Sequence, residues 1–227
     1  MTSEFPQRSV ALVWIWLPVE TEPVVAGRIT QDRNRYVFNY GASYLGRKDA
    51  IPIYEPELPL GRGVIEPSAG LSMASSIRDG SPDAWGRRVI INRLIGTKAT
   101  EAADLSELTF LLQSGSDRIG ALDFQTSATE YVPRLKANAP YEELLEAAAR
   151  VEKGVPLTPA LDLALNHGTS IGGARPKALI DDDERKLIAK FSASADLYSV
   201  VKAEFIAMKL ASACGLDVAP VSLIPAG

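Results

Sequence analysis

A glycine-rich turn near the carboxyl-terminal end of the chain is the first candidate for chemistry. Gly172 and Gly173 lie in the segment HGTSIGGARP together with Gly168. Glycine lets a backbone approach phosphate oxygens, and successive N–H groups can then point at them. The spacing matches neither common phosphate-loop pattern, so on the glycines alone a linker turn is the favoured interpretation. Ser170, in the same turn, is either an ordinary turn residue or a phosphorylation site.

Lys190 and Glu204 are the second candidate, because each carries a charge in an apolar setting. Lys190 lies within the predicted strand KLIAKF, on the face opposite Leu187 and Phe191. A lysine is costly to bury there without an anionic partner. Glu204 falls in the apolar stripe of the next predicted helix, so we expect the two side chains to form an ion pair. The pair is either structural or holds a lysine that orients nucleotide phosphates, as in a protein kinase, and the preceding Gly-rich hairpin favours the second.

The overall composition is that of an ordinary globular protein and excludes several other chemistries. Hydrophobic residues make up 46% and charged residues 23% of the 227 residues. The net charge of −4 gives no general attraction to nucleic acid, so contact with DNA would need a local patch or a partner. Because Cys214 is the only cysteine and His167 the only histidine, we expect no disulfide, zinc site or Ser-His-Asp triad. The acidic run DDDER at Asp181–Arg185 is expected to be a solvated hairpin loop rather than a metal site.

No segment is expected to direct the chain to a membrane or across one. The amino terminus, MTSEFPQRS, lacks the charged and apolar regions of a signal peptide. No apolar run reaches the length of about 18 residues that spans a bilayer. We therefore expect a cytoplasmic protein without membrane contact.

The first half of the chain predicts an α+β fold that opens with a small antiparallel sheet. Three short segments rich in β-forming residues, separated by turns, predict a meander. They are Val10–Leu17, Val24–Ile29 and Arg35–Tyr40. The segment SPDAWGRRVIINRLIG predicts a helix with Ser81 as its cap and Gly96 at its end. A helix at Leu105–Gln113 and a strand at Ile119–Phe124 are expected to follow.

The second half is predicted to form a separate unit. The polar, proline-containing stretch 131–140 is interpreted as a linker between residues 1–130 and 141–227. After it we predict helices at Tyr141–Glu152 and Thr158–Asn166, strands at Lys177–Ile180 and Lys186–Phe191, a helix through Glu204 that ends at Gly215, and a strand at Val218–Ile224. The expected architecture is a β-rich amino-terminal subdomain with helices, followed by a protein-kinase-like N-lobe built from a sheet and one long helix.

Several motifs in both halves strengthen this interpretation. The second half holds TSIGGARPKA at Thr169–Ala178, AKF around Lys190, and AEF around Glu204 followed by CGLDV. The first half holds DGSPDAWGRR at Asp79–Arg88 and DRIGALDF at Asp117–Phe124. Together these motifs resemble the HipA family, the serine/threonine kinase toxins of bacterial toxin–antitoxin pairs. The resemblance covers nearly the whole chain, and the combination is more specific than any single motif.

The resemblance implies a function, a cofactor and a partner. The family binds ATP with Mg²⁺ and phosphorylates protein targets, with aminoacyl-tRNA synthetases as its substrate class. The residues then expected to bind the ATP phosphates are Ser170, Gly172, Gly173, Lys190 and Glu204. Ser170 also matches the serine that family members autophosphorylate, which expels the Gly-rich loop and switches the kinase off. The implied partner is a helix-turn-helix, HipB-like antitoxin, and DNA would be reached only through it.

One part of the family pattern is not found in these 227 residues. The pattern continues through a C-lobe with a catalytic-loop aspartate, its asparagine and a metal-binding aspartate, and nothing after Gly215 matches them. The earlier pair Asp123-Phe124 is followed by Gln125 and precedes the predicted N-lobe. We therefore expect the chain alone to lack Mg²⁺ ligands and kinase activity, with a C-lobe on the same or a neighbouring gene.

Two other interpretations stay open. The chain is alternatively a free-standing module that regulates a separate kinase or toxin, with Arg87, Arg88 and Arg93 on its surface, although a solvated helix face is the favoured account of these arginines. A repressor that reads DNA directly is the weakest alternative, because no basic recognition helix is found. Exposed apolar surface discriminates between the first two, since a kinase lobe without its C-lobe leaves Val218–Ile224 uncovered.

Overall fold

The structure is a computed structural model that describes residues 9–96, 105–134, 139–165, 172–182 and 185–225. The strands are β1 (Val10–Ile15), β2 (Val24–Asp32), β3 (Arg35–Tyr40), β4 (Leu122–Gln125), β5 (Lys177–Asp182) and β6 (Arg185–Lys190). The helices are α1 (Ala42–Leu45), α2 (Ser75–Asp79), α3 (Ala84–Ile95), α4 (Glu107–Gln113), α5 (Tyr141–Glu152), α6 (Pro159–Leu165) and α7 (Val200–Ala213). Within the described residues, no helix is long and apolar enough to cross a membrane.

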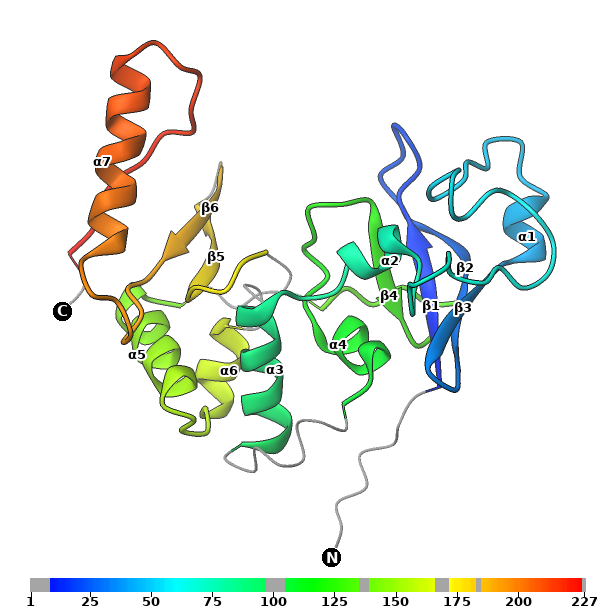
Figure 1. Cartoon of the computed structure of the whole chain (residues 1–227), viewed down its shortest axis with the longest axis horizontal. Coiled ribbons are helices and arrows are strands. Elements are labelled where there is room, and N and C mark those ends of the chain that lie inside the picture. The colour runs from blue at the N-terminus through cyan, green and yellow to red at the C-terminus, as the bar shows by residue number, and fades with distance from the viewer. Residues whose placement is uncertain (1–8, 97–104, 135–138, 166–171, 183–184, 226–227) are drawn as a thin grey trace, which may run out of the picture.

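The chain has a mixed α+β fold, as predicted, with two separate antiparallel sheets (Figure 1). The larger sheet has four strands in the order β3-β2-β1-β4, and the smaller is the β5–β6 hairpin. Figure 1 shows α1, α2 and α4 beside the larger sheet, and α3, α5 and α6 beside the hairpin. The predicted β1–β2–β3 meander is confirmed. The predicted linker and domain boundaries stay a prediction.

The first apolar core lies on one face of the four-stranded sheet. Ala11, Val13 and Ile15 alternate along β1 and are all buried, as the two-residue period of a strand requires. They pack with buried residues of α1, α2 and α4 in one cluster. Phe124 of β4 lies opposite Val13 and belongs to the same cluster, so a strand from far along the chain completes this core.

A buried charge network holds the start of β4. The Asp123 side chain is fully buried and accepts hydrogen bonds from Arg118 Nε at 2.9 Å and from Arg134 Nη2 at 2.7 Å. Burial by itself raises the pKa of Asp123, but the two guanidinium groups outweigh it and hold that pKa below its ordinary value. The strand predicted at Ile119–Phe124 is shorter than expected. It begins only at Leu122, and Ile119 is exposed to solvent.

The second apolar core joins α3 to the carboxyl-terminal half. Trp85 and Val89 of α3 are fully buried against Leu144 of α5, Leu165 of α6 and Phe191 beside β6. Helix α5 begins and ends where its pattern predicted. The apolar face of α3, which lies early in the chain, is thus covered by residues that follow much later.

Helix α7 lies apart from both cores (Figure 1) and has no buried residue. It ends as predicted at Gly215, which has a φ of 82° and donates its N–H to Ser212 O. The segment Val218–Ile224 was predicted to be a strand that stays unpaired; it pairs with none of the described strands, as expected, but it forms no regular strand. A short apolar segment becomes a strand only where a neighbouring edge accepts its hydrogen bonds.

The Asp123 network yields a stability prediction. Replacing Asp123 with alanine is expected to lower the free energy of unfolding by about 3–5 kcal/mol, because Arg118 is left buried without a counter-charge. Urea denaturation followed by circular dichroism measures this. The control is Arg35→Ala, which removes an ion pair with Glu66 that is 55% exposed on both sides. That change should cost less than about 1 kcal/mol, and equal losses in the two variants would contradict the assignment.

Candidate functional site

The Gly-rich turn is held by the start of α3. The Gly173 N–H donates to Asp83 Oδ2 at 2.6 Å, and the Gly173 carbonyl accepts the Trp85 N–H at 3.2 Å. Arg88 Nη2 donates to the Ala174 carbonyl at 2.6 Å. Side chains and backbone of one short segment therefore bind three backbone polar groups of Gly173 and Ala174. The conformation of the turn is fixed by α3 as well as by the hairpin that follows it.

Two features of α3 explain how it can reach the turn. The helix begins one residue after Asp83, which is its N-cap residue, so the predicted cap Ser81 is wrong. Ser81 Oγ instead donates to Glu107 Oε2 at 3.2 Å. The Asp83 carboxylate accepts no hydrogen bond from its own helix and is directed to Gly173. Trp85 anchors the segment, because its fully buried indole donates from Nε1 to the Lys177 carbonyl at 3.0 Å.

Lys177 is a site residue that the sequence reasoning missed. Only 5% of it is exposed, and its Nζ donates to the Gly172 carbonyl at 2.6 Å. Burial lowers the pKa of the Lys177 ammonium, the nearby Asp83 carboxylate opposes that change, and Lys190 reinforces it. The available signal was the hairpin register: Asp182 pairs with Arg185, so Lys177 must pair with Lys190. The side chains of Lys177 and Lys190 thus leave the backbone at paired positions of β5 and β6.

The predicted ion pair between Lys190 and Glu204 is confirmed, since Lys190 Nζ donates to Glu204 Oε1. Its predicted burial is wrong, because the two side chains are 46% and 42% exposed. The alternation along β6 is as expected, with Phe191 facing the core and Ile188 on the exposed face with Lys190. An exposed pair of this kind contributes about 0–1 kcal/mol to stability.

Some of the predicted site residues cannot be placed. Ser170 and Gly168 lie outside the described residues, so autophosphorylation of Ser170 stays a prediction. Gly172 and Gly173 are both described, and both are exposed at the surface. In the described part of the chain, no three His, Cys, Asp or Glu side chains gather in a way that could hold a metal ion.

Of the three arginines of α3, Arg88 is exposed as expected, whereas Arg87 and Arg93 are partly buried against neighbouring elements. Arg87 pairs with Glu107 of α4 at 2.6 Å. Arg93 donates to the Gln113 carbonyl at 2.7 Å, and burial lowers its pKa. Arg88, as described, binds the Gly-rich turn. These arginines therefore tie α3 to its neighbours, and this is why charge patterning alone misplaced Arg87 and Arg93.

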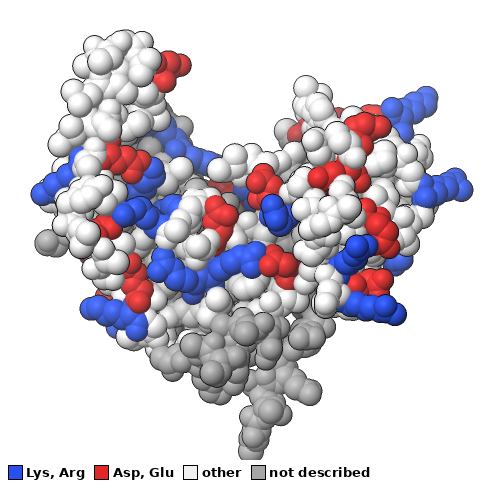
Figure 2. All heavy atoms as spheres, viewed as in Figure 1, with Lys and Arg blue, Asp and Glu red and all other residues white. Residues whose placement is uncertain are grey.

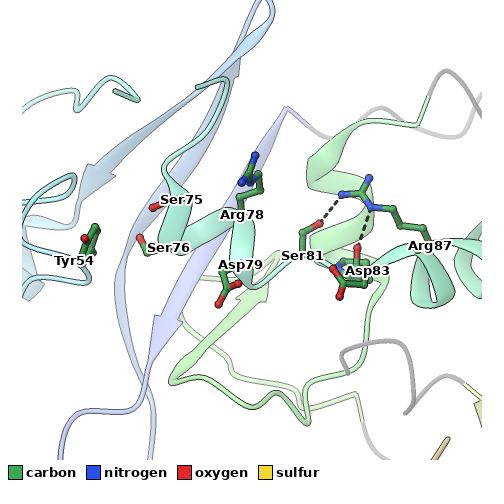
Figure 3. Close-up of a pocket in the computed structure, with 10 residues that line it drawn as sticks. Tyr54, Ser75, Ser76, Arg78, Asp79, Ser81, Asp83 and Arg87 are labelled. Carbon is green, nitrogen blue, oxygen red and sulfur yellow. Dashed lines mark hydrogen bonds between the residues drawn. The ribbon is translucent and has the colours of Figure 1, made fainter. Parts of the chain in front are cut away.

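An open cavity of about 760 Å³ lies between α2 and the start of α3 and includes Asp83 in its wall (Figure 3). Hydroxyl and charged groups line it, among them Ser75, Ser76, Arg78 and Asp79. Figure 2 shows acidic and basic side chains interspersed over this face of the molecule, with a hollow between the α7 side and the side of the larger sheet. Among the described residues on that face, basic side chains form no continuous patch.

These features define an α+β protein in which a segment early in the chain holds a glycine-rich turn that comes much later. Two protein-family models match the chain. The HipA N-terminal domain matches residues 17–125, and the HipA-like C-terminal domain matches residues 169–227. The chain belongs to the HipA family. A search of curated proteins found no match. The hydrogen bond between Asp83 and Gly173 joins the two matched regions.

The geometry of Gly173 yields a second prediction. Its φ is +108°, and a Cβ there would lie 2.5 Å from Lys177 Nζ. Gly173→Ala is therefore expected to cost about 1–2 kcal/mol of backbone strain and also to displace Lys177. The matched control is Gly63→Ala, where φ is +100° and no atom lies within 4 Å of the added Cβ.

Urea denaturation and tryptophan fluorescence separate the two effects. Both variants should lose similar stability, but only Gly173→Ala should change the emission of Trp85, which binds the backbone of Gly173 and Lys177. Identical emission spectra for the wild type and Gly173→Ala would show that the turn is not coupled to Trp85.

Proposed function

We propose that the Gly-rich turn and Lys190 bind the phosphates of ATP, and that the chain supplies the nucleotide-binding part of a HipA-like serine/threonine protein kinase of a toxin–antitoxin system. The observation that carries the proposal is the ion pair between Lys190, on the hairpin directly after the turn, and Glu204 of α7. In protein kinases a strand lysine held by a helix glutamate orients the nucleotide phosphates. Membership of the HipA family supports the same assignment.

The groups around the turn fit an anionic ligand. Lys190 is exposed enough to meet a phosphate from solvent, and Glu204 limits its orientations. Lys177 lies opposite Lys190 across the hairpin and binds the turn itself. Two ammonium groups and a backbone N–H are the donors that a polyphosphate prefers. The proposed order of contacts is Gly172, Gly173 and Lys177 at the turn, then Lys190 on the strand.

Phosphate transfer needs groups that we do not assign to these residues. A kinase uses an aspartate to accept the substrate hydroxyl proton and acidic side chains to hold Mg²⁺, which neutralises the developing charge. We assign no Mg²⁺ ligand here, because no acidic cluster forms among the described residues. The 227-residue chain is therefore proposed to bind ATP without transferring its phosphate to protein targets, including any aminoacyl-tRNA synthetase.

The surface of α7 favours a kinase lobe over a free-standing module. Ile206 and Leu210 on this helix are 56% and 61% exposed, and Leu216 after it is 63% exposed. Leu223 and Ile224 add further exposed apolar side chains. Apolar surface of this kind marks a contact with another element. We assign it to the kinase C-lobe, in the same polypeptide or from a neighbouring gene, and we place the helix-turn-helix antitoxin, with any bound DNA, elsewhere.

Removal of Lys190 tests the proposed function. Lys190→Ala is expected to weaken ATP binding at least tenfold, because a charge-assisted contact to phosphate contributes about 1.5–3 kcal/mol. Isothermal titration calorimetry with ATP measures this. Lys202→Ala is the matched control, since it removes an equal charge from the exposed surface of α7 near Glu204. Equal ATP affinity in the wild type and Lys190→Ala would refute the proposal.

The proposed lack of phosphate transfer has its own test. Purified 227-residue protein, incubated with radiolabelled ATP and Mg²⁺, is expected to incorporate no phosphate, because no base or metal ligand is assigned to it. Lys190→Ala, treated in parallel, reveals any contaminating kinase. Stoichiometric labelling that disappears in both Lys190→Ala and Ser170→Ala would show that the chain is active.

A further inference from the structure

The carboxylate of Asp83 accepts a hydrogen bond from the backbone N–H of Gly173, which in the proposed function would donate to a phosphate. Its Oδ2 accepts the Gly173 N–H at 2.6 Å, which is the length of a strong, charge-assisted hydrogen bond. The same carboxylate faces the Lys177 ammonium, which binds the adjacent Gly172 carbonyl, and it opposes the lowering of the Lys177 pKa that burial causes. A backbone N–H and an ammonium group at a glycine-rich turn are the donors that hold a phosphate oxygen. An internal anion therefore lies where a ligand anion would bind.

The other contacts of the turn do not require this carboxylate. The Trp85 N–H and Arg88 bind carbonyls of Gly173 and Ala174, so they would hold the turn without competing for an anion. Lys177 likewise binds the carbonyl of Gly172. Only Asp83 binds an N–H of the turn among these contacts. It also lies on the wall of the open cavity (Figure 3), so there is space for its side chain to leave.

We propose that Asp83 is a built-in competitor of phosphate that occupies the Gly173 N–H in the absence of nucleotide and must be displaced when ATP binds. This rests on the proposed function, because it concerns the same phosphate site. Two anions cannot share one donor, and their mutual repulsion adds to the cost of bringing the phosphate in. The protein is thereby held in a state of reduced ATP affinity by a residue of its HipA N-terminal region. Any partner that draws α3 or Asp83 away from the turn would raise that affinity.

Two substitutions distinguish competition from positioning. Asp83→Asn keeps an oxygen that can accept the Gly173 N–H but removes the charge, and Asp83→Ala removes both. If Asp83 competes with phosphate, both variants should bind ATP at least about fivefold more tightly than the wild type, the lower end of ordinary coupling between sites. If Asp83 instead positions the turn, Asp83→Ala should bind ATP more weakly, and Asp83→Asn should bind like the wild type.

Asp79→Asn is the matched control. Asp79 lines the same cavity and carries the same charge, and it is exposed, with no hydrogen bond to the described residues of the turn. Its replacement should change ATP affinity less than about twofold, because exposed charges that are not in contact are screened by salt. A gain in Asp79→Asn equal to the gain in Asp83→Asn would show a general effect of net charge and would overturn the proposal.

The experiment is calorimetry with ATP on the full 227-residue chain, combined with NMR of the backbone amides in ¹⁵N-labelled protein. Without nucleotide, the Gly173 amide resonance should shift in Asp83→Ala, and saturating ATP should shift it in the wild type. Tighter binding in both Asp83 variants together with these shifts supports the proposal. If the Asp83 variants bind ATP as the wild type does or more weakly, the proposal that Asp83 competes with phosphate is overturned. The proposed function is still supported in that case, provided that ATP binding by the wild type depends on Lys190. Absence of ATP binding in all of these proteins overturns both.

Discussion

The contact between Trp85 and the Gly-rich turn is the interaction on which the rest of the molecule depends. The indole is fully buried, and its Nε1 and backbone N–H bind the carbonyls of Lys177 and Gly173. Burial of a side chain of this size contributes several kilocalories per mole, and the two hydrogen bonds fix its direction. Because α3 also binds α4 through Arg87 and Glu107, one helix sets the position of the second core relative to the first.

This arrangement makes the proposed nucleotide site a property of the whole chain. In a free hairpin a glycine-rich turn would sample many conformations, since glycine restricts the backbone least. Here Asp83, Trp85 and Arg88 bind its N–H and carbonyl groups and select one conformation. The motifs at Asp79–Arg88 and Thr169–Ala178 look independent in the sequence, but residues of the first bind Gly173 and Ala174 of the second. A change in the amino-terminal part therefore reaches the proposed phosphate-binding donors through direct hydrogen bonds.

The sequence predicted local structure well and long-range polar contacts poorly. The meander, α5 and the pair of Lys190 with Glu204 follow from periodicities of two and 3.6 residues, which report which faces are buried. The hydrogen bond from Gly173 to Asp83 leaves no such signal, because its partners lie far apart in the chain and both residues also suit turns and caps. The segment Val218–Ile224 is unpaired, as expected, but it is not a strand, since strand formation depends on an available neighbour rather than on composition.

The Asp123 network and the pair of Lys190 with Glu204 differ in their energetic contribution because their burial differs. Asp123 is fully enclosed with its arginines, so it acts on folding, whereas Lys190 and Glu204 are nearly half exposed. An exposed ion pair contributes about 0–1 kcal/mol, which is too little to fix a helix that buries no residue. The segment before α7 is held more firmly, because Arg175 donates two hydrogen bonds to Asp196, whose side chain is 9% exposed. Under the proposed function, we therefore expect Glu204, and with it Lys190, to take one firm orientation when the apolar surface of α7 is covered.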